Sequence, residues 1–264
     1  MNIISHRTFL VSAISFIFLS LIVVHCIAQT DPELLYLKGW AWSSNIGWVD
    51  LNEVSIDPSS GNLNGYGWSS NIGWIDFSPA AVDLTTGKLI GWARACSVFA
   101  SGCAGVLEDN LSRGDWDGLI KMSGQADNGD EYGVRANNLQ ISGFAWGDLV
   151  VGWLSFDALI DVSSNANWQT CSLSANPSRV IPFQSTNLSW RAENSANCRI
   201  DSGIGTVCDN QASCEQGGAV TVKPAATATY ILTCRNNIFA WVFCNAAATV
   251  EVGAAPKIKE IRPQ

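Results

Sequence analysis

Short runs of alternating apolar and polar residues, separated by glycine-rich turns, follow one another along the chain after residue 35. Outside the N-terminal segment, no stretch keeps the period of an amphipathic helix. In one representative stretch, we expect strands at 63–68, 73–77 and 81–84. Because connections this short join antiparallel rather than parallel strands, the pattern predicts an all-β, antiparallel protein.

One of these runs is repeated almost unchanged. Residues 39–51, GWAWSSNIGWVDL, are followed 26 positions later by residues 65–77, GYGWSSNIGWIDF. A third copy opens at Gly91 and is interrupted by an insertion at 94–117, and a last half copy occupies 143–156. Sequence repeats of this kind form supersecondary units that bury one another's exposed faces. The sequence therefore predicts a tryptophan-rich, antiparallel β-repeat domain over residues 35–160.

Alternation separates the large side chains of each repeat into two faces. Trp48 shares a face with Asp50, while Val49 points the opposite way. The repeat has few other large residues, so we expect the tryptophans to be buried, and Trp48→Ala to cost about 3–5 kcal/mol. The alternative is an exposed aromatic row that stacks on sugar rings. The residues that distinguish the two interpretations are Trp42, Trp48, Trp68 and Trp74.

The composition changes after the repeats. A polar segment at 161–167 is out of repeat register and predicts a linker. Residues 168–252 have the size and strand spacing of an immunoglobulin-like β-sandwich, and residues 253–264 are expected to form an extended tail. The strands expected in the sandwich are 169–173, 185–191, 197–200, 219–222, 227–234 and 239–252.

The first 28 residues have the features of an export signal. Arg7 supplies early positive charge, residues 9–24 are apolar, and Ala28 offers a small residue for cleavage. The apolar run is intermediate in length between a signal and a spanning helix, so an uncleaved anchor is the alternative. Both interpretations place the remaining chain outside the membrane, extracellular or at the cell surface. Membrane contact is then expected only through this segment, if it is not cleaved.

Composition excludes several classes of function. Both histidines, His6 and His25, lie in the predicted signal, so the mature chain lacks the usual general base and the commonest metal ligand. The net charge of −8 repels the phosphate backbone of nucleic acids. We therefore expect no cofactor, metal or nucleic-acid partner. An enzyme would need a carboxylate pair, for which the nearest candidates are Glu108 with Asp109 and Asp115 with Asp117.

Cysteines are numerous. Cleavage of the signal would remove Cys26 and leave eight of the nine, and an even number in an exported chain indicates disulfides. Six cysteines in the last third allow fifteen pairings, so the connectivity stays open. The preferred pairs are Cys96 with Cys103, Cys171 with Cys244, Cys198 with Cys234, and Cys208 with Cys214.

Two segments resemble known families. The blocks 39–50 and 65–77 resemble tryptophan-rich repeats of predicted exported bacterial proteins, most of them without an assigned function. The segments at Cys171–Pro177, Leu188–Trp190 and Thr227–Cys234 are similar to bacterial immunoglobulin-like modules of cell-surface proteins. The resemblance implies an exported, surface-associated protein. No ligand-binding residue of this chain can be assigned from it.

Taken with the repeats, these features favour an exported cell-surface structural or adhesive protein without catalytic activity. Its expected partner is a cell-surface protein or a glycan. A carbohydrate-binding module that uses the repeat tryptophans is the alternative. The loops that begin at Asp57 and Asp83 are expected to be turns rather than calcium sites, because each offers one carboxylate beside Gly and hydroxyl residues.

Overall fold

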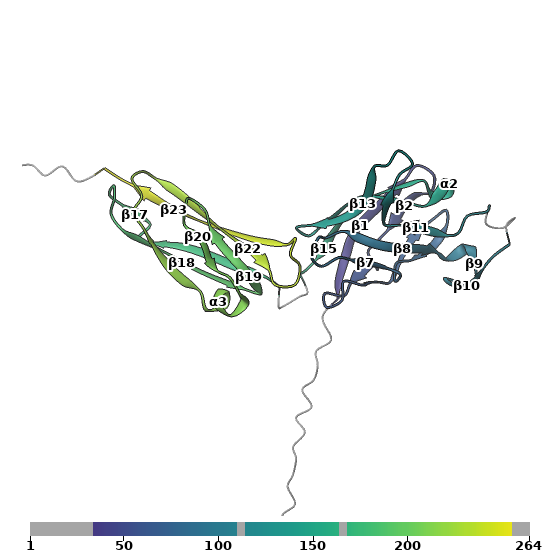
Figure 1. Ribbon diagram of the computed structural model, residues 1–264, viewed down its shortest axis with the longest axis horizontal. Coiled ribbons are helices and arrows are strands. Elements are labelled where there is room, and N and C mark those ends of the chain that lie inside the picture. Colours follow the sequence, from purple (N-terminus) through teal and green to yellow (C-terminus); the bar gives the residue numbers. More distant parts are fainter. Residues whose placement is uncertain (1–33, 110–113, 164–167, 255–264) are drawn as a thin grey trace, which may run out of the picture. The chain divides into compact units, whose positions relative to one another are not determined.

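The computed structural model describes residues 34–109, 114–163 and 168–254. The predicted export signal at 1–28, part of the predicted linker and almost all of the predicted tail lie outside these residues. Within the described ranges, no helix is long and apolar enough to cross a membrane. The chain is all-β: an antiparallel, barrel-like sheet is followed by a sandwich of two smaller sheets (Figure 1).

The repeats form a closed ring of eight antiparallel strands. Each of four hairpins contributes two strands, and the last strand pairs with both its hairpin partner and the first strand, which closes the ring. The hairpins are β1 (Leu35–Ser43) with β2 (Gly47–Asp50), β5 (Tyr66–Ser69) with β6 (Gly73–Asp76), β8 (Leu89–Ala95) with β11 (Leu119–Lys121), and β14 (Gln140–Trp146) with β15 (Trp153–Asp161).

Short elements extend this ring or connect its strands. The insertion in the third repeat carries its own small hairpin, and the disulfide Cys96–Cys103 ties the segment before this hairpin to its turn. The remaining elements of this region are β3 (Ser55–Ile56), β4 (Leu63–Asn64), β7 (Ala80–Val82), η1 (Cys96–Val98), β9 (Phe99–Ser101), β10 (Ala104–Leu107), β12 (Ser123–Gln125), β13 (Glu131–Asn137) and α2 (Asp148–Val151).

The interior of the ring is filled by pairs of one small and one branched residue. Eight strands enclose a space just wide enough for side chains to fill. At the equivalent level of each hairpin, alanine or glycine on the first strand lies opposite Val, Ile or Leu on the second. The pairs are Ala41 with Val49, Gly67 with Ile75, Ala93 with Ile120, and Ala145 with Leu154.

The prediction that the repeat tryptophans form the core is therefore wrong. Val49 and Trp48 do lie on opposite faces, as the alternation predicts. The face that carries Val49 is the buried one, however, since Val49 is fully buried and Trp48 is 58% exposed. Space inside the ring explains the outcome. Even a β-carbon on Gly67 would lie 2.9 Å from the ring of Phe77, so no indole fits at this level.

The turns at the hairpin tips link neighbouring repeats. Asn71 Nδ2 donates to the carbonyl oxygen of Ile46 at 3.1 Å, and Asn45 Nδ2 donates to that of Leu149 at 2.9 Å. Gly47 has a φ of 71°, which suits glycine in a turn. Asn45 and Asn71 thus hold the tips of adjacent hairpins together. Two serine hydroxyls donate to the same tips, Ser43 to Val151 and Ser69 to Ile46.

The loops at Asp57 and Asp83 are turns closed by their own carboxylates. Asp57 accepts hydrogen bonds from the amide and hydroxyl of Ser59, and Asp83 accepts from the amides of Thr85 and Thr86. The Ser59 hydroxyl is the main cause of a lowered pKa at Asp57, and the Thr86 amide is the main cause at Asp83. These contacts are the turn chemistry expected from the sequence.

Beyond residue 168, two sheets pack around a second core. The first sheet is β16 (Thr170–Asn176), β18 (Thr186–Glu193) and β21 (Gly218–Val222). The second is β17 (Arg179–Val180), β23 (Phe243–Val252), β22 (Ala228–Asn236), β19 (Ser195–Ile200) and β20 (Gly205–Cys208), with the short helix α3 (Gln211–Gln216) after β20. The pair β17–β23 is parallel. Leu188, Trp190 and Leu232 are among the buried residues that form this core.

The cysteines of the sandwich form three disulfides, in the pairs preferred from the sequence. Cys171–Cys244 joins the two sheets, whereas Cys198–Cys234 joins neighbouring strands of one sheet. Cys208–Cys214 ties β20 to α3. The sulfurs of Cys198, Cys208 and Cys214 lie within 4.8 Å of one another, but all three belong to disulfides and are not available as metal ligands.

The expected strand at 239–252 begins later, at Phe243. Asn236 Oδ1 accepts from the amides of Ile238 and Phe239, which turns the chain away from β22. Phe239, Trp241 and Val242 then join the core of the repeat region rather than that of the sandwich. The first core thus draws residues from beyond the predicted linker.

Candidate functional site

Three of the four hairpins present a set of three aromatic rings outside the ring of strands, here called an aromatic trio. Two rings come from the first strand of the hairpin and one from the second. The first trio is Trp40, Trp42 and Trp48, the second is Tyr66, Trp68 and Trp74, and the third is Phe144, Trp146 and Trp153.

The geometry of the trio is reproduced closely from one hairpin to the next. The aromatic side chain of the second strand contacts both others. In the first trio, the centroid of the Trp48 ring lies 4.9 Å from that of Trp42 and 6.4 Å from that of Trp40. The corresponding distances are 4.9 and 6.3 Å in the second trio and 4.8 and 6.3 Å in the third. The repeats therefore preserve an arrangement of outer rings as well as a core.

Every trio is open to solvent. The four candidate tryptophans, Trp42, Trp48, Trp68 and Trp74, are 44–58% exposed, and Trp146 alone among the nine rings is half-buried. The structure brings Trp42 to Trp48 and Trp68 to Trp74 as directly opposite cross-strand pairs. Sequence reasoning missed the five other rings, Trp40, Tyr66, Phe144, Trp146 and Trp153. Their position in the equivalent slots of each repeat was the available signal.

The trios lie on consecutive strands of the ring, in the order β14, β15, β1, β2, β5 and β6. Asp50 of the first hairpin is in register with Trp68 of the second, and Ser155 of the fourth is in register with Trp42 of the first. We call this surface the aromatic band. Tyr132 extends it, with its ring 4.9 Å from that of Trp153, and burial raises the pKa of its phenol.

Two shallow hollows occupy equivalent places in the band. One, of about 270 Å³, is lined by Trp40 and Trp48. The other, of about 300 Å³, includes Tyr66 and Trp74, which correspond to those residues one repeat later. Its wall is completed by Glu53, Gly102 and the Cys96–Cys103 disulfide. Two adjacent hairpins thus carry an aromatic hollow at equivalent positions.

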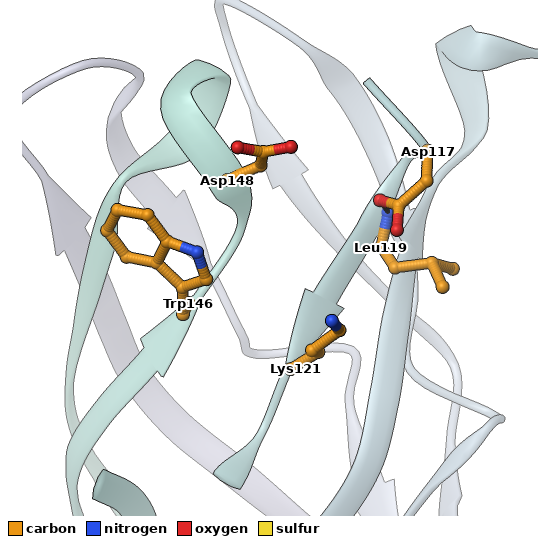
Figure 2. A pocket seen from close by; sticks show the side chains of 5 residues that line it. All are labelled: Asp117, Leu119, Lys121, Trp146 and Asp148. Carbon is orange, nitrogen blue, oxygen red and sulfur yellow. Dashed lines mark hydrogen bonds between the residues drawn. The ribbon is translucent and has the colours of Figure 1, made fainter. Parts of the chain in front are cut away.

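The third hairpin departs from this pattern. Arg94 and Leu119 are paired where the other hairpins pair two tryptophans, and Lys121 replaces Asp50. A pocket of about 200 Å³ lies where this hairpin meets the fourth (Figure 2). We call it the charged pocket. Its lining residues are Asp117, Leu119, Lys121, Trp146 and Asp148.

The structure brings one of the candidate carboxylates, Asp117, together with a residue that the sequence did not suggest. Asp117 lines the charged pocket opposite Asp148, and Asp115 is not among the lining residues. Asp148 and Lys121 were not anticipated, because they come from separate hairpins. Glu108 and Asp109 follow β10 in the insertion, where Glu108 is half-buried and Asp109 is exposed.

No protein-family model and no curated protein matches the chain. Among solved structures, the chain is similar to the Bacteroides ovatus mixed-linkage glucan utilization locus SGBP-B in complex with mixed-linkage heptasaccharide, at 15% sequence identity and a TM-score of 0.17. The match covers 83% of this chain and 60% of that chain. So distant a likeness establishes neither a shared fold nor a shared ligand.

Proposed function

We propose that the protein is an exported, non-catalytic adhesive module of the cell surface, and that its aromatic band binds carbohydrate. The observation that carries the proposal is the threefold occurrence of one exposed aromatic arrangement. Aromatic pairs alone stabilise hairpins, but nine such rings gathered on six consecutive strands exceed the scattered exposure ordinary for a soluble surface.

Stacking chemistry supports a sugar as the ligand. The apolar C–H faces of a pyranose fit against an aromatic ring, and the hydroxyls around its rim need polar partners. Asp50 and Asp76 supply such partners, because each lies directly opposite an aromatic residue of its own hairpin, Trp40 and Tyr66. Equivalent hollows on adjacent hairpins would contact successive units of one chain. Repetition then raises the overall affinity by multivalency.

The four disulfides indicate an oxidising environment, which supports export. In such a setting a glycan or a surface protein would be the partner. Competition distinguishes the two partners. Soluble oligosaccharide should displace a glycan partner from the aromatic band, whereas binding of a protein partner would not depend on it.

A glycan array on the purified protein tests the proposal, followed by titration calorimetry with the glycans retained. Replacing the central ring of a trio, by Trp48→Ala, Trp74→Ala or Trp153→Ala, should weaken binding about 2- to 10-fold each, the effect of one lost aromatic contact. Phe183→Ala is the matched control, since Phe183 is 70% exposed on the sandwich. Absence of glycan binding, or equal binding by all variants, would contradict the proposal.

A further inference from the structure

We propose, building on the carbohydrate-binding function above, that the charged pocket holds one neutral hexose unit and selects which glycan binds. The aromatic hollows offer stacking surface and few polar groups. The charged pocket instead combines one aromatic wall with two carboxylates and an ammonium group. Stacking that is common to many sugars would supply affinity along the band, and this pocket would supply discrimination.

Trp146 provides the aromatic wall and is held firmly in place. It is in register with Trp153 on one side and with Lys121 on the other, and its ring centroid lies 4.8 Å from that of Trp153. Figure 2 shows the indole on one side of the pocket, with its nitrogen turned toward the polar residues. A sugar ring seated here would have a fixed stacking face and a nearby N–H donor.

The two carboxylates are oriented by their own loops. Asp117 uses one oxygen to accept from the amide of Leu119 at 2.9 Å, and Asp148 uses one to accept from the amide of Leu149 at 2.7 Å. Among the described residues, the second oxygen of each accepts no hydrogen bond, and Lys121 forms no ion pair with either. Figure 2 shows the carboxylates facing one another across the pocket, with Lys121 below them.

These groups match the rim of a neutral hexose. The free carboxylate oxygens accept from sugar hydroxyls, and the Lys121 ammonium donates to a hydroxyl or ring oxygen, so that each hydrogen bond has one charged partner and is strong. The pocket holds two negative charges against one positive charge, in a chain of net charge −8. Uronic acids and sulfated or phosphorylated sugars would therefore be repelled.

The size of the pocket agrees with a single unit. Its volume of about 200 Å³ is below the roughly 300–1,000 Å³ of typical small-molecule sites, and one side is open. A polysaccharide could enter with one unit in the pocket, while neighbouring units continue over the third trio. The inferred ligand is thus a chain or branch of neutral hexoses, with one hexose recognised by hydrogen bonds.

Titration calorimetry on the full chain tests this inference, with neutral gluco-, manno- and galacto-oligosaccharides and with acidic oligogalacturonate and heparan-sulfate fragments as probes. Wild-type protein should bind at least one neutral series and neither acidic one. Asp117→Asn and Asp148→Asn should each weaken that binding about tenfold, the loss of one charge-assisted hydrogen bond. Asp127→Asn is the control, because Asp127 is exposed and outside the pocket.

The substitutions are chosen to keep the fold. Asp148 has a φ of 58°, a conformation that asparagine adopts readily, and the amide oxygen can still accept from Leu149. Lys121→Met tests the pocket separately from the carboxylates and should also weaken binding of the neutral probe. Thermal melting monitors the integrity of each variant.

The outcomes separate this inference from the function on which it rests. If no probe binds and the glycan array is negative, both proposals fail. If neutral glycans bind and the central-ring variants lose affinity, while Asp117→Asn, Asp148→Asn and Lys121→Met match Asp127→Asn, the aromatic band stands and the charged pocket is overturned. Preference for an acidic probe overturns the inference as well.

Discussion

The two β regions differ in where they place tryptophan and in how many disulfides they contain. In the ring of repeats, small and aliphatic side chains with Phe77 and Phe156 fill the interior and the tryptophans of the three trios lie outside, with one disulfide in the insertion. In the sandwich, Trp190 is 8% exposed inside the core, and three disulfides connect the surrounding elements. The tryptophans of the repeated hairpins are thus on the surface, whereas Trp190 of the sandwich belongs to a core. Lack of space inside the hairpin ring, rather than low hydrophobicity, places the repeated tryptophans outside.

The largest effect is expected inside the ring. Phe77 is fully buried and its ring centroid lies 6.4 Å from that of Phe156. Phe77→Ala should lower the free energy of unfolding by about 3–5 kcal/mol, because it removes core contacts and leaves a cavity. Urea denaturation followed by tryptophan fluorescence measures this loss. An unchanged denaturation midpoint would show that the ring interior is not the stabilising core.

The disulfide that joins the sheets of the sandwich should contribute about as much to that region. Cys171–Cys244 closes a separation of 73 residues, and replacing both cysteines by alanine should cost about 4 kcal/mol in the chain-entropy estimate. Amide hydrogen exchange should then show weaker protection in β16 and β23, with the ring strands unaffected. Equal loss of protection in both regions would remove the contrast between them.

A smaller effect is expected at the exposed tryptophans. Trp48→Ala should cost about 0.5–1.5 kcal/mol, the contribution of cross-strand aromatic contacts, and not the 3–5 kcal/mol of a core residue. The same urea denaturation compares this variant directly with Phe77→Ala. A loss as large as that of Phe77→Ala would mean that the outer rings serve stability, and would weaken the case for a binding surface.

The smallest effect concerns pH. Hydrogen bonds lower the folded-state pKa of Asp57 and Asp83 below the usual 3.8, so their contribution is present above that pH and is lost as the pH falls through the lowered values. Wild-type protein should lose its advantage in melting temperature over Asp57→Asn/Asp83→Asn as the pH falls below about 4. Asp209→Asn, in the sandwich, is the control. A constant difference at all pH values would contradict this assignment.

Alternation along the sequence was sufficient for the all-β class, the hairpins and the separation of Trp48 from Val49. It was not sufficient to decide which face is inside, because both faces of each strand are apolar. The deciding signal was steric: Ala41, Gly67 and Ala93 occupy equivalent positions, and residues this small on one face indicate a crowded interior. The small residues indicate a crowded interior only once the strands are known to form a closed ring. An open stack of repeats has no such narrow centre.

The charged pocket was beyond sequence reasoning for a different reason. Asp117, Lys121 and Asp148 come from two hairpins, and their meeting depends on the register between β11 and β14. No spacing rule connects residues across that pairing, because the insertion before Asp117 shifts the repeat. The preferred disulfide pairs, by contrast, match the structure, although the sequence alone left fifteen pairings open for the six cysteines of the last third.

Closure of the ring by β15 and β1 fixes the number of repeats at four. An open array of repeats can lengthen or shorten by gain or loss of a unit during evolution, and it needs specialised end units. This ring cannot gain or lose a repeat in the same way, and it has no end units. Removal of one hairpin would leave two strands unpaired. An added hairpin would widen the interior beyond what its alanines can fill. Variation is therefore confined to what each hairpin displays outward, as the third hairpin already illustrates.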